Sequence, residues 1–244
     1  MRKCSIGLIL VSMSLTVPSI ALAQTAQRQG AGKAQAAGSM PDLSGVWEPR
    51  APTAGLFSKE PPPLQPWAEQ KSRPNRENPQ NPTSGRQNER DPYLKCAPPG
   101  VPRVWLTPTP FEIVQSPQRV LIFFESDNTI RQIWTDGRGH PKGLGKTWSG
   151  NSIGHWDGDT LVVDTIGFND ATWLDYGGNV HSDALHLMER LRRPDHNTLV
   201  IDMTMEDPKA FTKPYIVKRF ADLRPDWVIG EYIICEDKYL ILAH

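Results

Sequence analysis

The sequence predicts an all-β protein whose strands form an antiparallel meander that closes into a β-barrel. From Arg103 onward, short runs of β-branched and aromatic residues alternate with turn residues such as Asp157-Gly158, which is the pattern of strands joined by hairpins. No window shows the 3.6-residue apolar period of an amphipathic helix, so βαβ units are not expected. Closure removes exposed strand edges and therefore favours a barrel, with a two-sheet sandwich as the alternative.

The N-terminal residues have the features of a secretory signal peptide. Met1-Arg2-Lys3 is basic, an apolar run follows from Ile6 to about Val17, and Ala21-Leu22-Ala23 fits the cleavage pattern of small residues. The apolar run is short for a membrane span. We therefore expect removal of residues 1–23, a periplasmic or secreted mature protein, and no membrane insertion after signal removal. An uncleaved anchor is the alternative.

The rest of the chain is expected to be a disordered leader followed by one domain. Residues 24–40 are mostly Ala, Gly, Gln and Lys, with almost nothing to bury. Residues 41–244 form the domain, which opens with a short strand around Gly45-Val46-Trp47. Prolines dominate residues 52–102, so this proline-rich arm should be extended or loose, with at most a short helix at 66–73.

Strands are expected throughout the part of the chain that follows the arm. Turn residues such as Pro194-Asp195-His196-Asn197 and Arg224-Pro225-Asp226 separate the apolar runs. The expected strands lie at 111–116, 119–125, 129–135, 151–156, 160–166, 184–193, 198–206, 214–221 and 227–236.

Cysteine usage predicts one disulfide. Removal of residues 1–23 leaves Cys96 and Cys235, in a compartment where disulfides persist. The simplest expectation is a bridge that ties the proline-rich arm to the last strand, and two buried thiols are the alternative.

Charge and motifs argue against several functional classes. The chain has 27 Lys and Arg residues and 27 Asp and Glu residues, so no basic surface for nucleic acid or an acidic membrane is indicated. No Gly-rich phosphate loop, Gly-x-Ser-x-Gly nucleophile elbow or Cys-x-x-Cys pair is identified, so common nucleotide, serine-hydrolase and redox chemistries are not expected. We expect no cofactor, and a small-molecule ligand as the partner.

Glu189 lies on the apolar face of its expected strand. Side chains alternate across a strand, so Glu189 shares a face with Leu187 and Leu191. We expect Ile201 to face it on its own hairpin, where no basic partner is available. An unpaired buried carboxylate can act as an acid or base near neutral pH. Glu189 is therefore the first catalytic candidate, with His181 or His186 as its acid.

Glu231 repeats this pattern in the expected strand 227–236. A hairpin centred near Pro225 would set Arg219 opposite Glu231, and we expect the two to pair inside the barrel or at its mouth. Both residues are also candidate ligand contacts. A register error of one residue would place Glu189 and Glu231 in water.

The connection 167–183 combines aromatic residues, carboxylates and a histidine with little strand pattern, which is typical of a binding loop at a barrel rim. Its candidate ligand contacts are Asn169, Trp173, Asp175 and Tyr176, which Asp164 could join. His181 and His186 lie five residues apart without a glutamate in the zinc-motif position, so no metal site is expected.

Several motifs resemble those of a widespread family of exported bacterial proteins that has no assigned chemistry. They are Pro41-Asp42-Leu43-Ser44-Gly45-Val46-Trp47, Phe111-Glu112-Ile113-Val114-Gln115, Gly158-Asp159-Thr160-Leu161-Val162-Val163-Asp164-Thr165, Phe168-Asn169 with Thr172-Trp173-Leu174-Asp175, and His181-Ser182-Asp183-Ala184-Leu185-His186. The Gly45-Val46-Trp47 opening is also similar to the first strand of lipocalin-like barrels, which bind small apolar molecules inside the barrel. That second resemblance implies a lipocalin-like β-barrel.

Two functional hypotheses follow. The first is a periplasmic barrel that binds a small, partly apolar molecule in its cavity, with the connection 167–183 as a lid. The second is a cofactor-independent lyase, isomerase or hydrolase on the same scaffold, in which Glu189 and His181 or His186 act as base and acid. A third class, an envelope interaction protein that uses the proline-rich arm, would need an exposed apolar patch. The first two differ in whether Glu189 and the histidines share one pocket.

Overall fold

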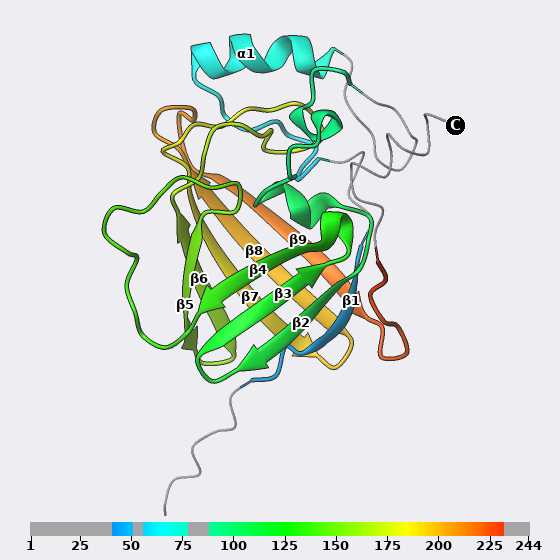
Figure 1. The fold of residues 1–244 in the computed structure, drawn as a ribbon. Coiled ribbons are helices and arrows are strands. Elements are labelled where there is room, and N and C mark those ends of the chain that lie inside the picture. Colours follow the sequence, from blue (N-terminus) through cyan, green and yellow to red (C-terminus); the bar gives the residue numbers. More distant parts are fainter. Residues whose placement is uncertain (1–40, 51–55, 78–87, 232–244) are drawn as a thin grey trace, which may run out of the picture. The chain divides into compact units, whose positions relative to one another are not determined.

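The computed structural model describes residues 41–50, 56–77 and 88–231, in which nine strands close into one barrel in sequence order (Figure 1). The prediction of an all-β barrel is thus confirmed, and the alternative of a two-sheet sandwich is wrong. The strands are β1 (Gly45–Pro49), β2 (Phe111–Ser116), β3 (Arg119–Phe124), β4 (Thr129–Trp134), β5 (Asn151–Asp157), β6 (Thr160–Ile166), β7 (His186–Asp195), β8 (Thr198–Glu206) and β9 (Tyr215–Leu223).

The barrel is mixed, which corrects the expected antiparallel meander. β4 and β5 are parallel, whereas every other neighbouring pair is antiparallel, including the β1–β9 pair that closes the ring. Strand directions can alternate all the way around a closed ring only if the number of strands is even. Nine strands therefore require a parallel pair, and the long connection 135–150 provides the crossover that parallel neighbours need.

The expected last strand is wrong over its described part. Residues Trp227–Glu231 form no strand, and Glu231 is exposed. Arg219 does face inward from β9, but its guanidinium Nη2 donates to the backbone oxygen of Arg50 at 2.7 Å. The predicted Arg219–Glu231 pair is therefore absent, because the chain leaves the barrel after β9 instead of turning back as a hairpin.

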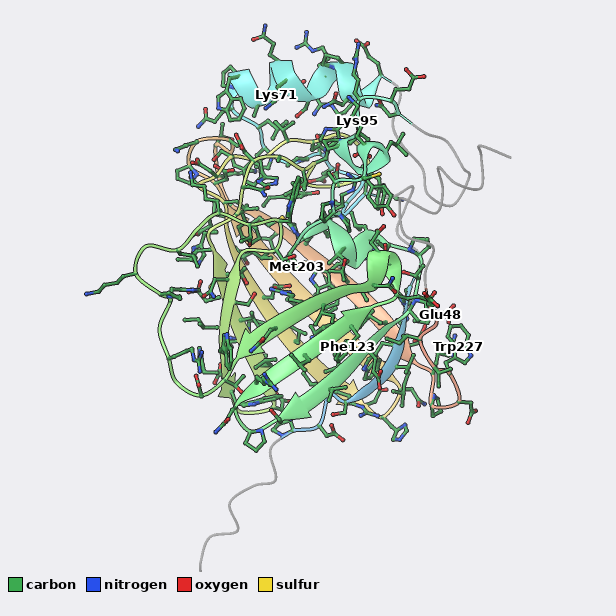
Figure 2. All side chains as sticks on the ribbon, in the orientation of Figure 1. Glu48, Lys71, Lys95, Phe123, Met203 and Trp227 are labelled. Carbon is green, nitrogen blue, oxygen red and sulfur yellow. The ribbon has the colours of Figure 1, made fainter. Side chains whose placement is uncertain are left out.

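Alternation along the strands fills the barrel interior with apolar side chains. Met203 of β8 points into the barrel and is fully buried, whereas Trp227 lies outside it and is 44% exposed (Figure 2). Three buried rings meet between the end of the proline-rich arm and the first strands. Trp105, from the 3₁₀ helix η3 (Arg103–Leu106), makes edge contacts with Phe111 and Phe124 at centroid distances of 5.2 and 5.0 Å.

One end of the barrel is covered by the described part of the arm and by the connection 167–183 (Figure 1). The arm contains helix α1 (Pro66–Arg76) and the 3₁₀ helix η2 (Pro92–Lys95). The Asn75 amide donates to the backbone oxygen of Gly178 at 3.1 Å. A Cβ atom on Gly178 would lie 2.3 Å from the Asn75 Cβ, and its φ is +84°, so this close approach requires glycine.

Several predictions fall on residues that the structure does not describe. The signal peptide, the leader and Cys235 lie outside the described residues, so export and the Cys96–Cys235 disulfide stay predictions. Within the described ranges, the helices are all too short or too polar to cross a bilayer.

Candidate functional site

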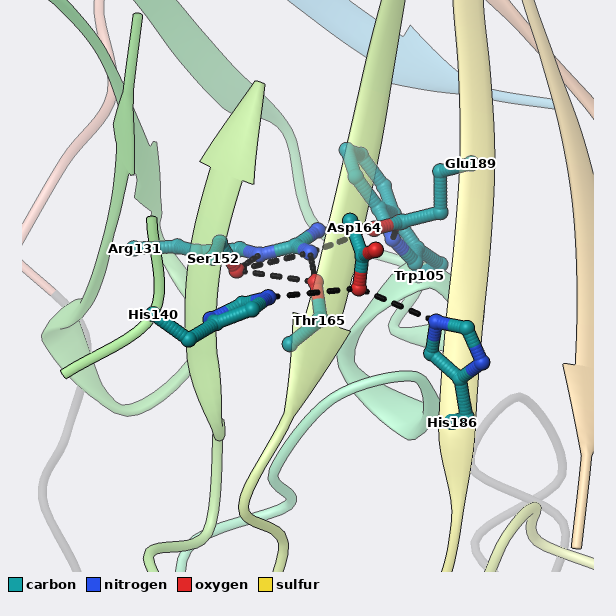
Figure 3. Close-up of polar contacts among 8 residues, drawn as sticks. All are labelled: Trp105, Arg131, His140, Ser152, Asp164, Thr165, His186 and Glu189. Atoms are coloured by element: carbon teal, nitrogen blue, oxygen red, sulfur yellow. Dashed lines mark hydrogen bonds and ion pairs between the residues drawn. The ribbon is translucent and has the colours of Figure 1, made fainter. Parts of the chain in front are cut away.

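Glu189 faces the barrel interior, as predicted, but it has a basic partner. Arg131 of β4 contacts both carboxylate oxygens: Nη1 donates to Oε1 at 2.9 Å, and Nη2 donates to Oε2 (Figure 3). The Trp105 indole donates to Oε1 at 2.7 Å. Glu189 is fully buried, and Arg131 is 2% exposed. The expectation of an unpaired carboxylate is therefore wrong, and Met203, not Ile201, faces Glu189 on β8.

Hydroxyl groups complete this buried network. Arg131 Nη2 also donates to Ser152 Oγ at 3.1 Å and to Thr165 Oγ1 at 3.0 Å. Arg131 was missed because reasoning within one hairpin does not reach across the barrel. The available signal was the alternation in β4, where Arg131 shares the inward face with the buried Ile133, but the apolar Ile130 and Trp134 on the other face obscured it.

His186 lies on the opposite side of the barrel wall from Glu189. Its Nε2 contacts Asp164 Oδ1 at 3.0 Å, and His140 Nε2 contacts the same oxygen at 3.3 Å (Figure 3). Asp164 and Thr165 are consecutive in β6 and point to opposite faces. Asp164 therefore belongs to an outer cluster, and no group of metal-ligating side chains that could hold an ion occurs among the described residues.

His181 is also separate from Glu189, in the connection that covers the barrel end. It is 2% exposed. Its Nδ1 lies 3.0 Å from the backbone oxygen of Ser182, and its Nε2 lies 3.3 Å from Thr172 Oγ1. The carbonyl can only accept, so Nδ1 carries the proton in the neutral ring and Nε2 accepts from the threonine. Burial lowers the pKa of His181, which keeps the ring neutral.

The buried His181 predicts acid sensitivity near neutral pH. Its pKa is lower in the folded than in the unfolded protein, so the unfolded state takes up the proton first and stability falls as pH drops through about 6.5. Thermal melts between about pH 7.5 and 5.5 should show this loss. His181→Asn, which retains a donor near the Nδ1 position, should show a flatter profile. Parallel profiles for the two proteins would contradict the prediction.

Trp173 and Tyr176 pack on a buried arginine and so do not offer open faces to a ligand. The Arg103 guanidinium lies 4.1 Å from the ring centroid of Tyr176 and 5.7 Å from that of Trp173. Arg103 Nη1 donates to Asp91 Oδ1 at 2.7 Å, and both charged side chains are almost fully buried. These two predicted ligand contacts therefore hold the connection 167–183 against the arm.

Asp175 is the predicted ligand contact that the structure places in a pocket. The pocket lies at the covered barrel end and has a volume of about 200 Å³. Its walls come from the arm, α1, the connection 167–183 and β9, through Leu56, Ser58, Lys59, Glu60, Pro61, Pro62, Arg76, Asp175, Gly177, Asn179 and Tyr215. We call it the end pocket.

The polar groups of the end pocket are held in place by one another. Asp175 accepts hydrogen bonds from the Gly177 backbone at 2.9 Å and from the Asn179 amide at 2.8 Å. Asn179 Oδ1 in turn accepts from Arg76 at 3.0 Å. Burial raises the pKa of the Asp175 carboxyl despite these bonds. The Tyr215 hydroxyl donates to a backbone oxygen at 3.1 Å, and burial raises its pKa as well.

The remaining predicted site residues lie elsewhere. Asn169 closes a local turn by accepting from the Ala171 backbone at 3.2 Å. Arg219 lies inside the barrel and is 8% exposed; among the described residues it pairs with no carboxylate, and burial lowers its pKa. Neither residue lines the end pocket.

Gly150-Asn151-Ser152-Ile153-Gly154 has the Gly-x-Ser-x-Gly spacing of a serine nucleophile, which the sequence reasoning passed over. The structure places Ser152 in β5, with its side chain in the buried Arg131 network. A nucleophile elbow instead presents its serine at a turn between a strand and a helix. Within the described ranges, Ser152 bonds to Arg131 and Thr165, not to a histidine. The spacing therefore lacks the context of a serine hydrolase.

Comparison of the chain with models of known protein families found no match, and a search of curated proteins also found none. The resemblance to exported bacterial proteins therefore stays a prediction, as does the lipocalin-like likeness.

Proposed function

We propose that the protein binds a small, partly apolar molecule in the end pocket. The observation that carries this proposal is a pocket with walls from separate segments of the chain, which combines the apolar side chains of Leu56, Pro61 and Pro62 with polar groups that include the buried Asp175. A concave, mainly apolar site with a few fixed polar groups is the usual form of a small-molecule site. The site differs from the barrel cavity expected from the sequence, because Trp105 and Glu189 occupy part of that interior.

The lining indicates the chemistry of the ligand. Leu56, Pro61 and Pro62 supply apolar surface, and the Tyr215 oxygen can accept a hydrogen bond in addition to the one it donates. The charged side chains are two basic residues, Lys59 and Arg76, and two acidic ones, Glu60 and Asp175. Because these charges balance, the favoured ligand is a compact molecule with an apolar ring or chain and a neutral polar group.

Binding of benzamide, observed by ligand-detected NMR, tests the proposal. A ligand of this size should bind with a Kd in about the millimolar range. Ser58→Trp places an indole in the end pocket and should abolish the binding, whereas Leu121→Trp on the outer face of β3 should not. Failure of benzamide and of its phenol and benzyl alcohol analogues to bind the parent protein would overturn the proposal, as would equal binding by Ser58→Trp.

The enzyme hypothesis has no comparable support in the described residues. Glu189 is paired with Arg131, His186 lies on the outer side of the wall, and His181 contacts Thr172 and Ser182. An acid and a base must reach one substrate together. We therefore put forward binding, and not acid–base catalysis, as the function.

A further inference from the structure

The parallel strands β4 and β5 leave a gap in the barrel wall. They pair at only two positions, Ile133↔Ser152 and Trp134↔Ile153. The antiparallel pairs on either side are longer, with six paired positions between β3 and β4 and seven between β5 and β6. Residues 130–132 of β4 thus face the start of β5 without continuing the pairing, and a pocket of about 240 Å³ lies between them.

The pocket in this gap is lined mainly by polar groups. Arg131 and Ser152, which belong to the buried network, line it together with Gln132, Ser149 and Asn151. The Gln132 Nε2 is buried and has no hydrogen-bond partner. A buried donor left unsatisfied costs on the order of 1–3 kcal/mol. A ligand oxygen that accepts a hydrogen bond from Gln132 Nε2 would remove this cost.

The outer cluster of histidines and Asp164 extends to this pocket. Asp164 contacts His140 Nε2, and His140 Nδ1 lies 2.8 Å from the Asn151 side-chain amide. A nitrogen of the imidazole thus fixes one end of that amide. That end is the Asn151 Oδ1, so the amide nitrogen at the other end can donate to a ligand. The cluster therefore has a positioning role for Asn151.

The charges around the gap favour an uncharged ligand. Arg131 is the only ionised residue that lines the pocket among the described residues, and the Glu189 carboxylate already matches its charge through two hydrogen bonds. Arg138, which lies 3.6 Å over the Trp134 ring, is paired with Asp136. Among the residues that line the pocket, an anion would find no unmatched positive charge and would lose its hydration without compensation.

From these observations we infer a second binding site, between β4 and β5, for a small uncharged polyhydroxylated molecule of monosaccharide size. Gln132, Ser149 and Asn151 supply neutral hydrogen-bonding groups, and Trp134 and Ile130 supply apolar surface for the less polar face of such a ligand. A volume of about 240 Å³ is below that of a typical drug-sized site. This site is independent of the end pocket.

Saturation-transfer NMR with glucose, myo-inositol, glucose 6-phosphate and glucuronate tests the inference. The two neutral compounds should bind and the two anions should bind more weakly. Gln132→Met retains the length of the side chain without its donor and should weaken binding about two- to tenfold, the value of one hydrogen bond. Ser149→Phe should block the pocket, whereas Thr204→Val, on the outer face of β8, should bind as the parent does.

Two results would overturn the inference: failure of both neutral compounds to bind the parent protein, or binding that is equal in the parent, Gln132→Met and Ser149→Phe. Ser58→Trp separates this site from the end pocket. It should leave glucose binding unchanged while abolishing benzamide binding, so either proposal can fail alone.

Discussion

Replacing Arg131 with Met should lower the free energy of unfolding by about 3–5 kcal/mol, because it leaves the Glu189 carboxylate buried without its ion pair. The Glu189 carboxylate would then keep the single hydrogen bond that the Trp105 indole donates to it. For a domain of this size the change corresponds to a fall in Tm of roughly 6–20 °C. Urea denaturation followed by far-ultraviolet circular dichroism measures the loss directly.

The double variant Arg131→Met with Glu189→Gln separates a lost ion pair from simple loss of packing. It removes both charges and retains an acceptor for Trp105, so at least half of the lost stability should return. Arg190→Met is a matched control on β7, the strand that carries Glu189, because Arg190 pairs with Asp157 in an exposed position. That control should change stability by less than about 1 kcal/mol. A double variant as unstable as Arg131→Met, or a parent-like Arg131→Met, would contradict the prediction.

The strand pattern was predictable because the alternation of residues and the turn residues are local properties. The observed β2, β6 and β8 have the predicted bounds. Two features were not local, namely the parallel β4–β5 pair and the departure of the chain from the barrel after β9. The parallel β4–β5 pair follows from the odd number of strands in the closed ring, and the sequence left that number at nine or ten. Trp227–Glu231 was also taken as the start of a strand. The apolar residues there, such as Trp227 and Ile229, alternate as in a strand but leave the barrel.

The candidate site was less predictable than the fold, since its contacts join distant segments. Alternation placed Glu189 inside correctly, yet its partner Arg131 comes from a strand on another part of the barrel. Tyr176 is an aromatic residue in a long connection, as many ligand contacts are. Whether its ring faces a ligand or packs on an arginine depends on tertiary contacts, which the sequence does not show. Asp175 was found because the connection 167–183 combines aromatic residues, carboxylates and a histidine with little strand pattern. Arg76, which also lines the end pocket, belongs to a proline-rich stretch that gave no signal.

Arg103→Met should also destabilise the protein by about 3–5 kcal/mol, and its effect should concentrate at the covered barrel end. The substitution leaves Asp91 buried without a counter-charge and removes the cation that Tyr176 and Trp173 pack against. The connection 167–183 would then lose its attachment to the arm. Hydrogen exchange should rise in residues 173–180 more than in β7 and β8, whose pairing does not involve Arg103.

Arg103→Lys distinguishes the role of the guanidinium from that of charge alone. Lysine retains the positive charge but cannot form the two parallel bonds to Asp91 or stack flat on Tyr176, so it should recover only part of the loss. Arg138→Met is the matched control, because Arg138 also pairs with an aspartate and stacks on a tryptophan, but its side chain is 46% exposed. Arg138→Met should lower the free energy of unfolding by less than about 1 kcal/mol, because exposed ion pairs are screened by water. Equal losses for Arg103→Met and Arg138→Met would show that burial of the first pair does not set its contribution.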